Sequence, residues 1–94
     1  MLLGDNMIKV NTVTITTAGT RVQLASDISV ITNIKFKAPS SNEGLVAIGD
    51  STVSMTNGYE LSAGQTLELP RVELSEVYVD AATNGDKVSW IGND

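Results

Sequence analysis

The sequence predicts a small all-β protein, an antiparallel β-sandwich or jelly-roll-like barrel. Apolar residues alternate with polar ones in short segments from Met7 onward, which is the period of half-buried strands. Turn-forming residues separate these segments, and no window carries the apolar stripe of an amphipathic helix. About seven to nine short strands at this spacing are typical of an antiparallel sandwich.

The first half of the chain contains the clearest strand pattern. Apolar residues change phase around Asn11-Thr12, which predicts a β-bulge or a change of sheet at that point. After the Ala18-Gly19 turn and a short strand, Ile34 and Phe36 alternate with Lys35 and Lys37. We therefore expect this strand to bury its apolar side chains and to expose the two lysines.

The stretch from Gly44 to Leu69 predicts a compact β meander. A short apolar strand stops at Gly49-Asp50-Ser51, whose residue types close turns. Asn57-Gly58 favours a type I′ hairpin turn, because that turn needs positive φ at both central positions. Pro70 is expected to end the last strand, since proline has no amide for a ladder.

The C-terminal part predicts further strands around a second hairpin signal. Asn84-Gly85 is again the sequence of a type I′ turn. Trp90 shares its phase with Val88 and is expected in the core, whereas Tyr78 alternates against its apolar neighbours and is expected to be exposed.

A chain of 94 residues is expected to form one domain, with residues 1–6 as an N-terminal arm and residues 7–94 as the sandwich. The absence of cysteine excludes disulfide cross-links. Met1-Leu2-Leu3 is followed at once by polar residues, so neither a signal peptide nor a membrane span is expected. Synthesis in a cytoplasm is the expectation.

The charge is negative and unevenly distributed. The chain has 6 basic and 11 acidic residues, a net charge of −5. Residues 1–42 carry +2 and residues 43–94 carry −7. Binding to nucleic acid through a basic face is therefore not expected, and an acidic patch facing a basic partner is the functional alternative to a merely solvated surface.

Residues for catalysis are sparse. The chain has no histidine, which removes the commonest general base and the usual zinc ligand sets. Gly49-Asp50-Ser51 resembles the nucleophile block of GDS-type esterases, but such a serine needs a histidine. Glu73 with Glu76, or Asp80 with Asp86, is a carboxylate pair only by proximity in sequence. The sequence predicts no enzyme.

Two kinds of binding site remain as alternatives. Asp80, Asn84 and Asp86 are oxygen donors around one loop, but they lack the spacing of an EF-hand and are common turn formers. The sequence thus predicts no metal and no cofactor. Tyr59 and Tyr78 are the candidate aromatic contacts of a carbohydrate-binding module.

Several motifs resemble those of small virion proteins of tailed bacteriophages. In that pattern a strand ending in Gly-Asp-Ser leads to a glycine-containing turn, a Leu-x-x-Gly-x-x-Leu stretch, a Tyr-Val-Asp strand, then Asn-Gly and a closing strand. The corresponding segments here are Ile48–Ser51, Asn57-Gly58, Leu61–Leu67, Tyr78–Asp80 and Asn84–Ile91, and Thr12–Leu24 resembles the first hairpin.

This resemblance implies a structural protein of the virion, made in the host cytoplasm. The expected role is that of a capsid decoration (cement) protein, which binds the outside of the shell at subunit junctions and stabilises it. Its expected partners are the major capsid protein or other virion proteins, and it is expected to be a homo-oligomer, a trimer among the forms considered, without nucleic acid or membrane partners. A neck, tail or fibre-associated component is the alternative, and a carbohydrate-binding module the further one.

The residues predicted to lie at such an interface come from the N-terminal arm, the lysine strand and the acidic C-terminal half. They are Met1, Leu2, Leu3, Asp5, Asn6, Lys35, Lys37, Glu73, Glu76 and Tyr78.

Overall fold

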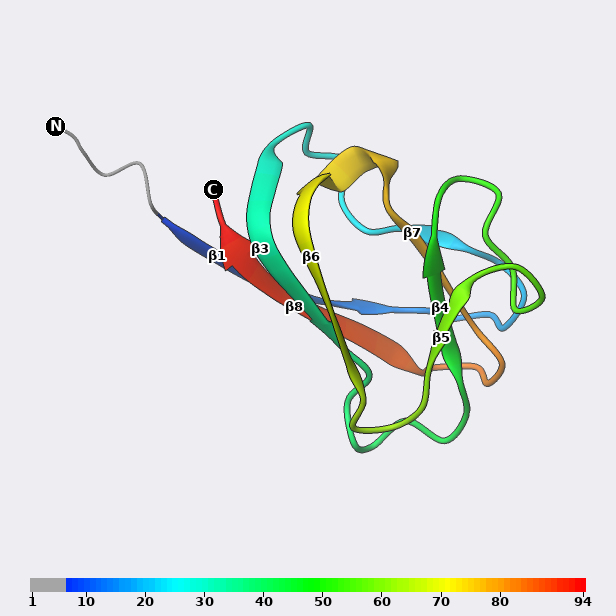
Figure 1. Cartoon of the computed structure of the whole chain (residues 1–94). Helices are drawn as coiled ribbons and strands as arrows, with labels where there is room; N and C mark the ends of the chain where they lie inside the picture. Colours follow the sequence, from blue (N-terminus) through cyan, green and yellow to red (C-terminus); the bar gives the residue numbers. More distant parts are fainter. Residues whose placement is uncertain (1–6) are drawn as a thin grey trace, which may run out of the picture.

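Eight antiparallel strands form the protein in a computed structural model, which describes residues 7–94. The strands are β1 (Ile8–Thr14), β2 (Val22–Gln23), β3 (Val30–Lys37), β4 (Val46–Gly49), β5 (Tyr59–Leu61), β6 (Thr66–Glu73), β7 (Tyr78–Ala81) and β8 (Lys87–Asn93). A single turn of 3₁₀ helix, η1 (Leu74–Glu76), joins β6 to β7 (Figure 1). Within residues 7–94, no helix has the length and apolar character needed to cross a membrane.

The strands form two four-stranded sheets with jelly-roll connectivity. Sheet 1 has the order β1-β8-β3-β6 and sheet 2 has the order β2-β7-β4-β5. Each strand of the first half therefore pairs with its counterpart counted from the end: β1 with β8, β2 with β7, β3 with β6 and β4 with β5. This is the pattern of one long hairpin folded double, which distributes its strands over two sheets. The predicted fold class is confirmed.

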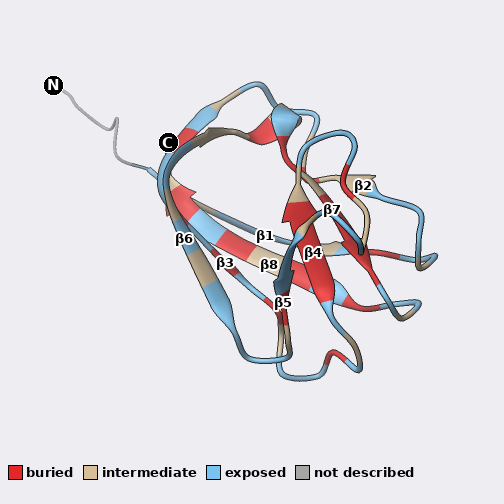
Figure 2. Ribbon diagram, turned by 45° about the vertical axis from the view of Figure 1, so that its right-hand side comes forward, coloured by how far each residue is buried: buried red, intermediate tan, exposed pale blue. Residues whose placement is uncertain are grey.

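The core fills the space between the sheets. Ile34, Phe36 and Trp90 point inward from sheet 1, and Val46 and Val79 point inward from sheet 2. Figure 2 shows the result as continuous burial along β4 and β7 and as alternating burial along β8. Trp90 is thus a core residue, and Lys35 and Lys37 are exposed, as the alternation predicted.

The predicted irregularity at Asn11-Thr12 is wrong, because β1 pairs with β8 without interruption from Ile8 to Thr14. The phase change has another cause: Ile8 and Val10 are exposed on this edge strand, while Val13 packs against the core. The bulge lies in β3 instead, where the register with β8 shifts between Thr32 and Lys35. Asn33 adopts a φ of 51° there, a conformation that asparagine tolerates.

The two Asn-Gly sequences do not form type I′ hairpins. Gly58 and both asparagines lack positive φ, and Gly85 alone has it, at 86°. The Asn57 side chain instead organises a loop, accepting from the Ser54 amide at 2.7 Å and donating to the Thr52 carbonyl at 3.2 Å. The Asn84-Gly85 segment connects β7 of sheet 2 to β8 of sheet 1 and so closes no hairpin.

The predicted meander is correct only for its first pair of strands. β4 and β5 are neighbours in sheet 2, but β6 crosses to sheet 1 and pairs with β3. The predicted end of this strand at Pro70 is also wrong, since β6 continues to Glu73. Pro70 is tolerated because β6 is an edge strand and because the position opposite Asn33 is the one place along β6 where the ladder with β3 has no pair.

Candidate functional site

The predicted interface residues lie in two separate places. Lys35 and Lys37 are on the outer face of sheet 1, the face turned away from the core. Glu73, Glu76 and Tyr78 lie at one end of the sandwich, where β6, η1 and β7 follow one another. The other predicted interface residues, Met1, Leu2, Leu3, Asp5 and Asn6, are outside the described residues.

The outer face of sheet 1 is built from two rows of cross-strand neighbours. One row consists of Val10, Ile91, Lys35 and Glu68, and the other of Thr12, Ser89, Lys37 and Thr66. The hydroxyls of Thr12 and Ser89 are hydrogen-bonded to each other at 3.0 Å. The pleat of the four long strands therefore places apolar side chains on the β1 side of this face and lysines toward its centre.

A shallow groove of about 340 Å³ runs between these two rows. Val10 and Ile91 form its apolar wall, and the side chains of Lys35 and Lys37 border it from β3. Within residues 7–94, the only ion pairs are those of Lys9, so both lysines of the groove keep their charge available for a partner. The arrangement suits an apolar contact flanked by acidic groups.

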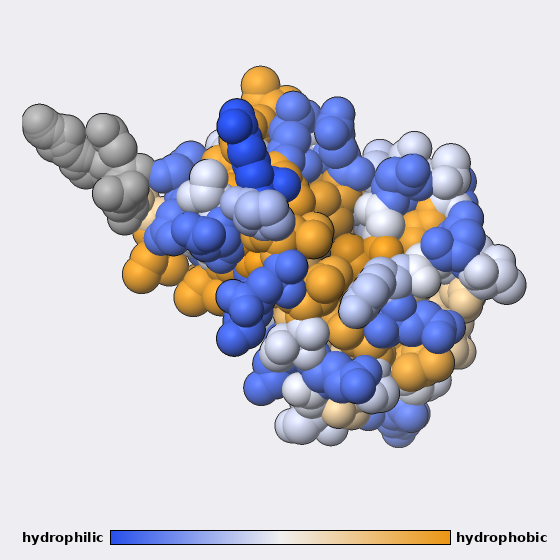
Figure 3. Space-filling model, in the orientation of Figure 1, coloured by the Kyte–Doolittle hydropathy of each residue, from blue (hydrophilic) through white to orange (hydrophobic). Residues whose placement is uncertain are grey.

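The second place is an acidic depression, lined by Asp50 together with Glu73, Glu76 and Tyr78. It consists of two adjoining hollows of about 470 and 420 Å³, which share Asp50 and Glu76. Figure 3 shows hydrophobic side chains reaching the surface in the middle of the view, with hydrophilic side chains around them. The sequence indicates only a turn at Asp50 and contains no signal that places Asp50 at this depression.

Short hydrogen bonds hold the carboxylates of the acidic depression. Asp50 accepts from the Thr52 amide at 2.9 Å and from the Thr52 hydroxyl at 2.6 Å. The hydroxyl bond and then the amide bond of Thr52 lower the pKa of Asp50 below its ordinary value. Glu73 accepts from the Ser75 hydroxyl at 2.5 Å. Both carboxylates are thereby fixed within local turns.

The candidate calcium ligands serve the fold. Asp80 accepts from the amides of Gly19 and Ala81, at 3.0 and 2.8 Å, and Asp86 accepts from those of Glu43 and Gly44, at 3.0 and 2.8 Å. Both carboxylates are buried, and these amides replace the water that burial removes. In the part of the chain that the structure describes, no group of three or more histidine, cysteine, aspartate or glutamate residues could hold a metal ion.

The two tyrosines do not form one aromatic platform. On sheet 2, Tyr59 is opposite Ile48, whereas Tyr78 is opposite Gly49, the next residue along β4. Because successive residues of a strand point to opposite faces, the two tyrosine side chains leave the sheet on opposite sides.

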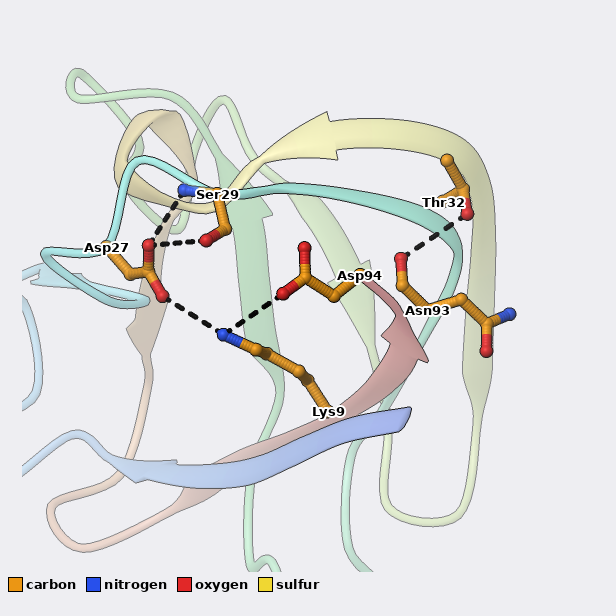
Figure 4. A network of polar contacts seen from close by, with 6 residues as sticks. All are labelled: Lys9, Asp27, Ser29, Thr32, Asn93 and Asp94. Atoms are coloured by element: carbon orange, nitrogen blue, oxygen red, sulfur yellow. Dashed lines mark hydrogen bonds and ion pairs between the residues drawn. The ribbon is translucent and has the colours of Figure 1, made fainter. Parts of the chain in front are cut away.

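Lys9 on β1 forms ion pairs with two carboxylates. Its ammonium is 3.4 Å from a carboxylate oxygen of Asp27 and 3.4 Å from one of Asp94 (Figure 4). The hydrogen bonds to Asp94 and Asp27 raise the pKa of Lys9. Asp27 also accepts from the hydroxyl and amide of Ser29, at 2.7 and 2.8 Å, and these bonds lower the pKa of Asp27. The charge of Lys9 is therefore neutralised within the subunit, and the group of one lysine and two aspartates has a net charge of −1.

Comparison with solved structures finds cupin-like proteins with a similar β-sandwich fold. An RmlC-like cupin protein from Desulfovibrio desulfuricans superposes with a TM-score of 0.56 at 17% identity, over 95% of this chain and 74% of that one. A cupin superfamily protein from Desulfitobacterium hafniense gives 0.51 at 12% identity, over 96% and 69%. A cupin-2 domain-containing protein from Shewanella frigidimarina gives 0.50 at 18% identity, over 100% and 76%. No protein-family model and no curated protein matches the chain.

These neighbours correct two expectations from the sequence. The resemblance to phage virion proteins extends to a small β-sandwich, but the neighbours are cupin-like proteins rather than virion proteins. The prediction that the chain is not an enzyme is contradicted. The neighbours are cupin and RmlC-like proteins, a family that often has enzymatic or metal-binding members. None of the three neighbours is named as a specific enzyme.

Proposed function

We propose that the protein is a structural subunit of a bacteriophage virion, a capsid decoration protein that docks on the outside of the shell. The observation that supports this is the outer face of sheet 1, where four strands leave apolar and lysine side chains uncovered next to one another. The resemblance of several sequence motifs to those of small phage virion proteins supports the assignment to a virion. Docking occurs at subunit junctions of the major capsid protein.

The residues of this face make two kinds of contact with the shell. Val10 and Ile91 provide the apolar contact, which gains free energy by leaving water. Lys35 and Lys37 border that contact and attract acidic groups of the shell. A small domain bound in this way is stabilised by mass action, because only its folded form binds the lattice.

Charge reversal on the lysines tests the proposal. Purified protein is mixed with shells assembled from the major capsid protein of the same particle, and the bound fraction is measured by cosedimentation. We expect Lys35→Glu to weaken binding about tenfold, and added salt to weaken binding of the wild type, because the attraction is between exposed charges. Arg21→Glu is the matched control, since Arg21 is exposed but lies outside sheet 1.

Equal binding of Lys35→Glu and wild type would remove this face as the docking surface. The copy number of the chain in purified particles, measured by quantitative peptide mass spectrometry, tests its place in the virion. An abundance similar to that of the shell protein supports decoration, whereas a few copies per particle would move the protein to the neck or tail.

A further inference from the structure

Sheet 1 has two edges that differ in their protection. β6 forms one edge and contains Pro70, a residue that hinders strand addition because it has no amide. β1 forms the other edge, contains no proline and follows β8 regularly over seven residues. Among residues 7–94, no strand pairs with the open side of β1.

The backbone polar groups of β1 point alternately to β8 and to the open side. The Met7 carbonyl accepts from the Asp94 amide at 2.9 Å, and the Ile15 amide donates to the Asp86 carbonyl at 2.9 Å. Since a strand has a period of two, the odd-numbered residues bond to β8. The even-numbered residues direct their amides and carbonyls to the open side: Ile8, Val10, Thr12 and Thr14.

The side chains of these even-numbered residues are exposed to solvent, as are their outward-pointing backbone groups. Ile8 is 69% exposed and Val10 is 66% exposed, and Ile91, which is opposite Val10 on β8, is 44% exposed. The apolar band therefore extends from the outer face of sheet 1 to its open edge. Long, regular and apolar edge strands are templates for pairing with another strand.

The charge near this edge permits a like strand to approach. Lys9 is the only charged residue of β1, and its ammonium is turned to Asp27 and Asp94 of the same subunit, 3.4 Å from each (Figure 4). In a pair of β1 strands each Lys9 therefore keeps its carboxylate partners within its own subunit, and no other charged residue lies on the paired strands. Thr12 is the one even-numbered residue with a local partner, since its amide donates to the Asn11 side chain at 2.8 Å.

We propose that two copies of this chain form a dimer in which β1 pairs antiparallel with β1 of the second copy, joining the two copies of sheet 1 into one eight-stranded sheet. The occupant is a second copy because β1 is self-complementary. A register centred on Asn11 sets even-numbered residues opposite even-numbered residues, and in it the Thr12 amide exchanges its Asn11 partner for the Val10 carbonyl of the second copy. It also keeps Ile8 and Val10 of both copies on one face, as a two-fold interface requires.

Cysteine cross-linking tests the register, because the chain has no cysteine of its own. In the proposed dimer the two Asn11 side chains are direct neighbours at the two-fold axis, about 4.5–5.5 Å apart at Cβ. Ile8 is separated from Ile8 of the second copy by about 20 Å along the strands. We expect oxidised dimer for Asn11→Cys at a yield at least about tenfold above that of Ile8→Cys, or of the exposed loop variant Ser41→Cys.

Blocking the open edge tests the pairing itself. Val10→Pro removes an amide that points away from β8, so the ladder to β8 stays complete. Val10→Lys places a like charge at the junction of the two strands and needs no change of backbone. We expect wild type and Val10→Thr to sediment as dimers at roughly 100 µM, where an interface with a micromolar Kd is occupied. Val10→Pro and Val10→Lys are expected to be monomers that unfold at a temperature close to that of the wild-type monomer.

A wild-type monomer at that concentration would overturn the proposal. So would a dimer or trimer that Val10→Lys leaves intact and that Asn11→Cys does not cross-link. The pairing uses the edge of sheet 1 and not its outer face, so its failure would leave the proposed docking on a shell untouched.

Discussion

The outer faces of the two sheets differ although both turn away from the same core. On sheet 2, Ala47 is fully buried and Asp80 is only 2% exposed, even though both point outward. The loop between β4 and β5 folds back over Ala47 with the buried side chain of Val53, and the Gly19 amide binds Asp80. On sheet 1, the corresponding positions Val10 and Lys35 are exposed.

Strand length explains part of this difference. The strands of sheet 1 have seven or eight residues, whereas those of sheet 2 have two to four. Short strands bury little surface by pairing, so sheet 2 gains burial from the loop that covers it. Sheet 1 has long ladders and needs no cover, which leaves its outer face for contacts with other molecules.

The largest effect is expected where the loop approaches sheet 2 most closely. A Cβ on Gly58 would be 2.6 Å from the Ala47 Cβ and 2.7 Å from a Val53 methyl group. We expect Gly58→Ala to destabilise the protein by about 3 kcal/mol, since the loop must lift to make room. Ser89→Ala on the outer face of sheet 1 should cost less than about 0.5 kcal/mol. Urea unfolding measures both, and equal midpoints would show that the loop is not a tight cover.

A smaller effect is expected from one isosteric substitution made on each sheet. Val53→Thr places a hydroxyl where the side chain is 2% exposed, and we expect a cost of about 2 kcal/mol because that hydroxyl loses its water. Val10→Thr keeps the branched shape and exposes its hydroxyl, so its cost should be within about 0.5 kcal/mol. Thermal unfolding of the two variants would contradict the comparison if their midpoints fell equally.

The smallest effect is expected from pH. Asp50 in the covering loop and Asp27 before β3 both have a pKa lowered by hydrogen bonds, from Thr52 and Ser29 respectively. Their contribution is complete above the ordinary pKa of about 3.8 and is lost as pH falls through the lower, folded value. Asp50→Asn and Asp27→Asn should therefore each flatten the loss of thermal stability below about pH 4. An unchanged slope in both variants would show that neither carboxylate contributes.

The alternation of residues in the sequence predicted which side of a strand meets the core. It correctly placed Phe36 and Trp90 inside and Lys35 outside, because these choices depend on neighbours along one strand. It could not show whether the opposite side meets water or a loop. Asn57-Gly58 illustrates the reason: its tertiary contacts with Ala47 and Val53 override the local preference for a hairpin turn.

The candidate sites were predictable to a similar degree. Glu73, Glu76 and Tyr78 are close in sequence and lie at one depression, whereas Asp50, from another strand end, joins them only through the pairing of β4 with β7. The separation of this depression from Lys35 likewise follows from sheet order, which no single strand encodes. The uncovered face of sheet 1 required the arrangement of four strands to be known.

The pairing of β1 with β8 also has a consequence for the speed of folding. Ile8 is opposite Asn93, so closing this ladder joins positions at the two ends of the described chain. The entropy lost in closing so large a loop is not recovered until the intervening strands have ordered. Proteins dominated by such distant pairings fold in milliseconds to seconds, far more slowly than helical bundles of equal size. During that interval β1 is unpaired and its apolar residues are exposed. A newly synthesised chain therefore contacts other chains before its own β8 pairs with β1.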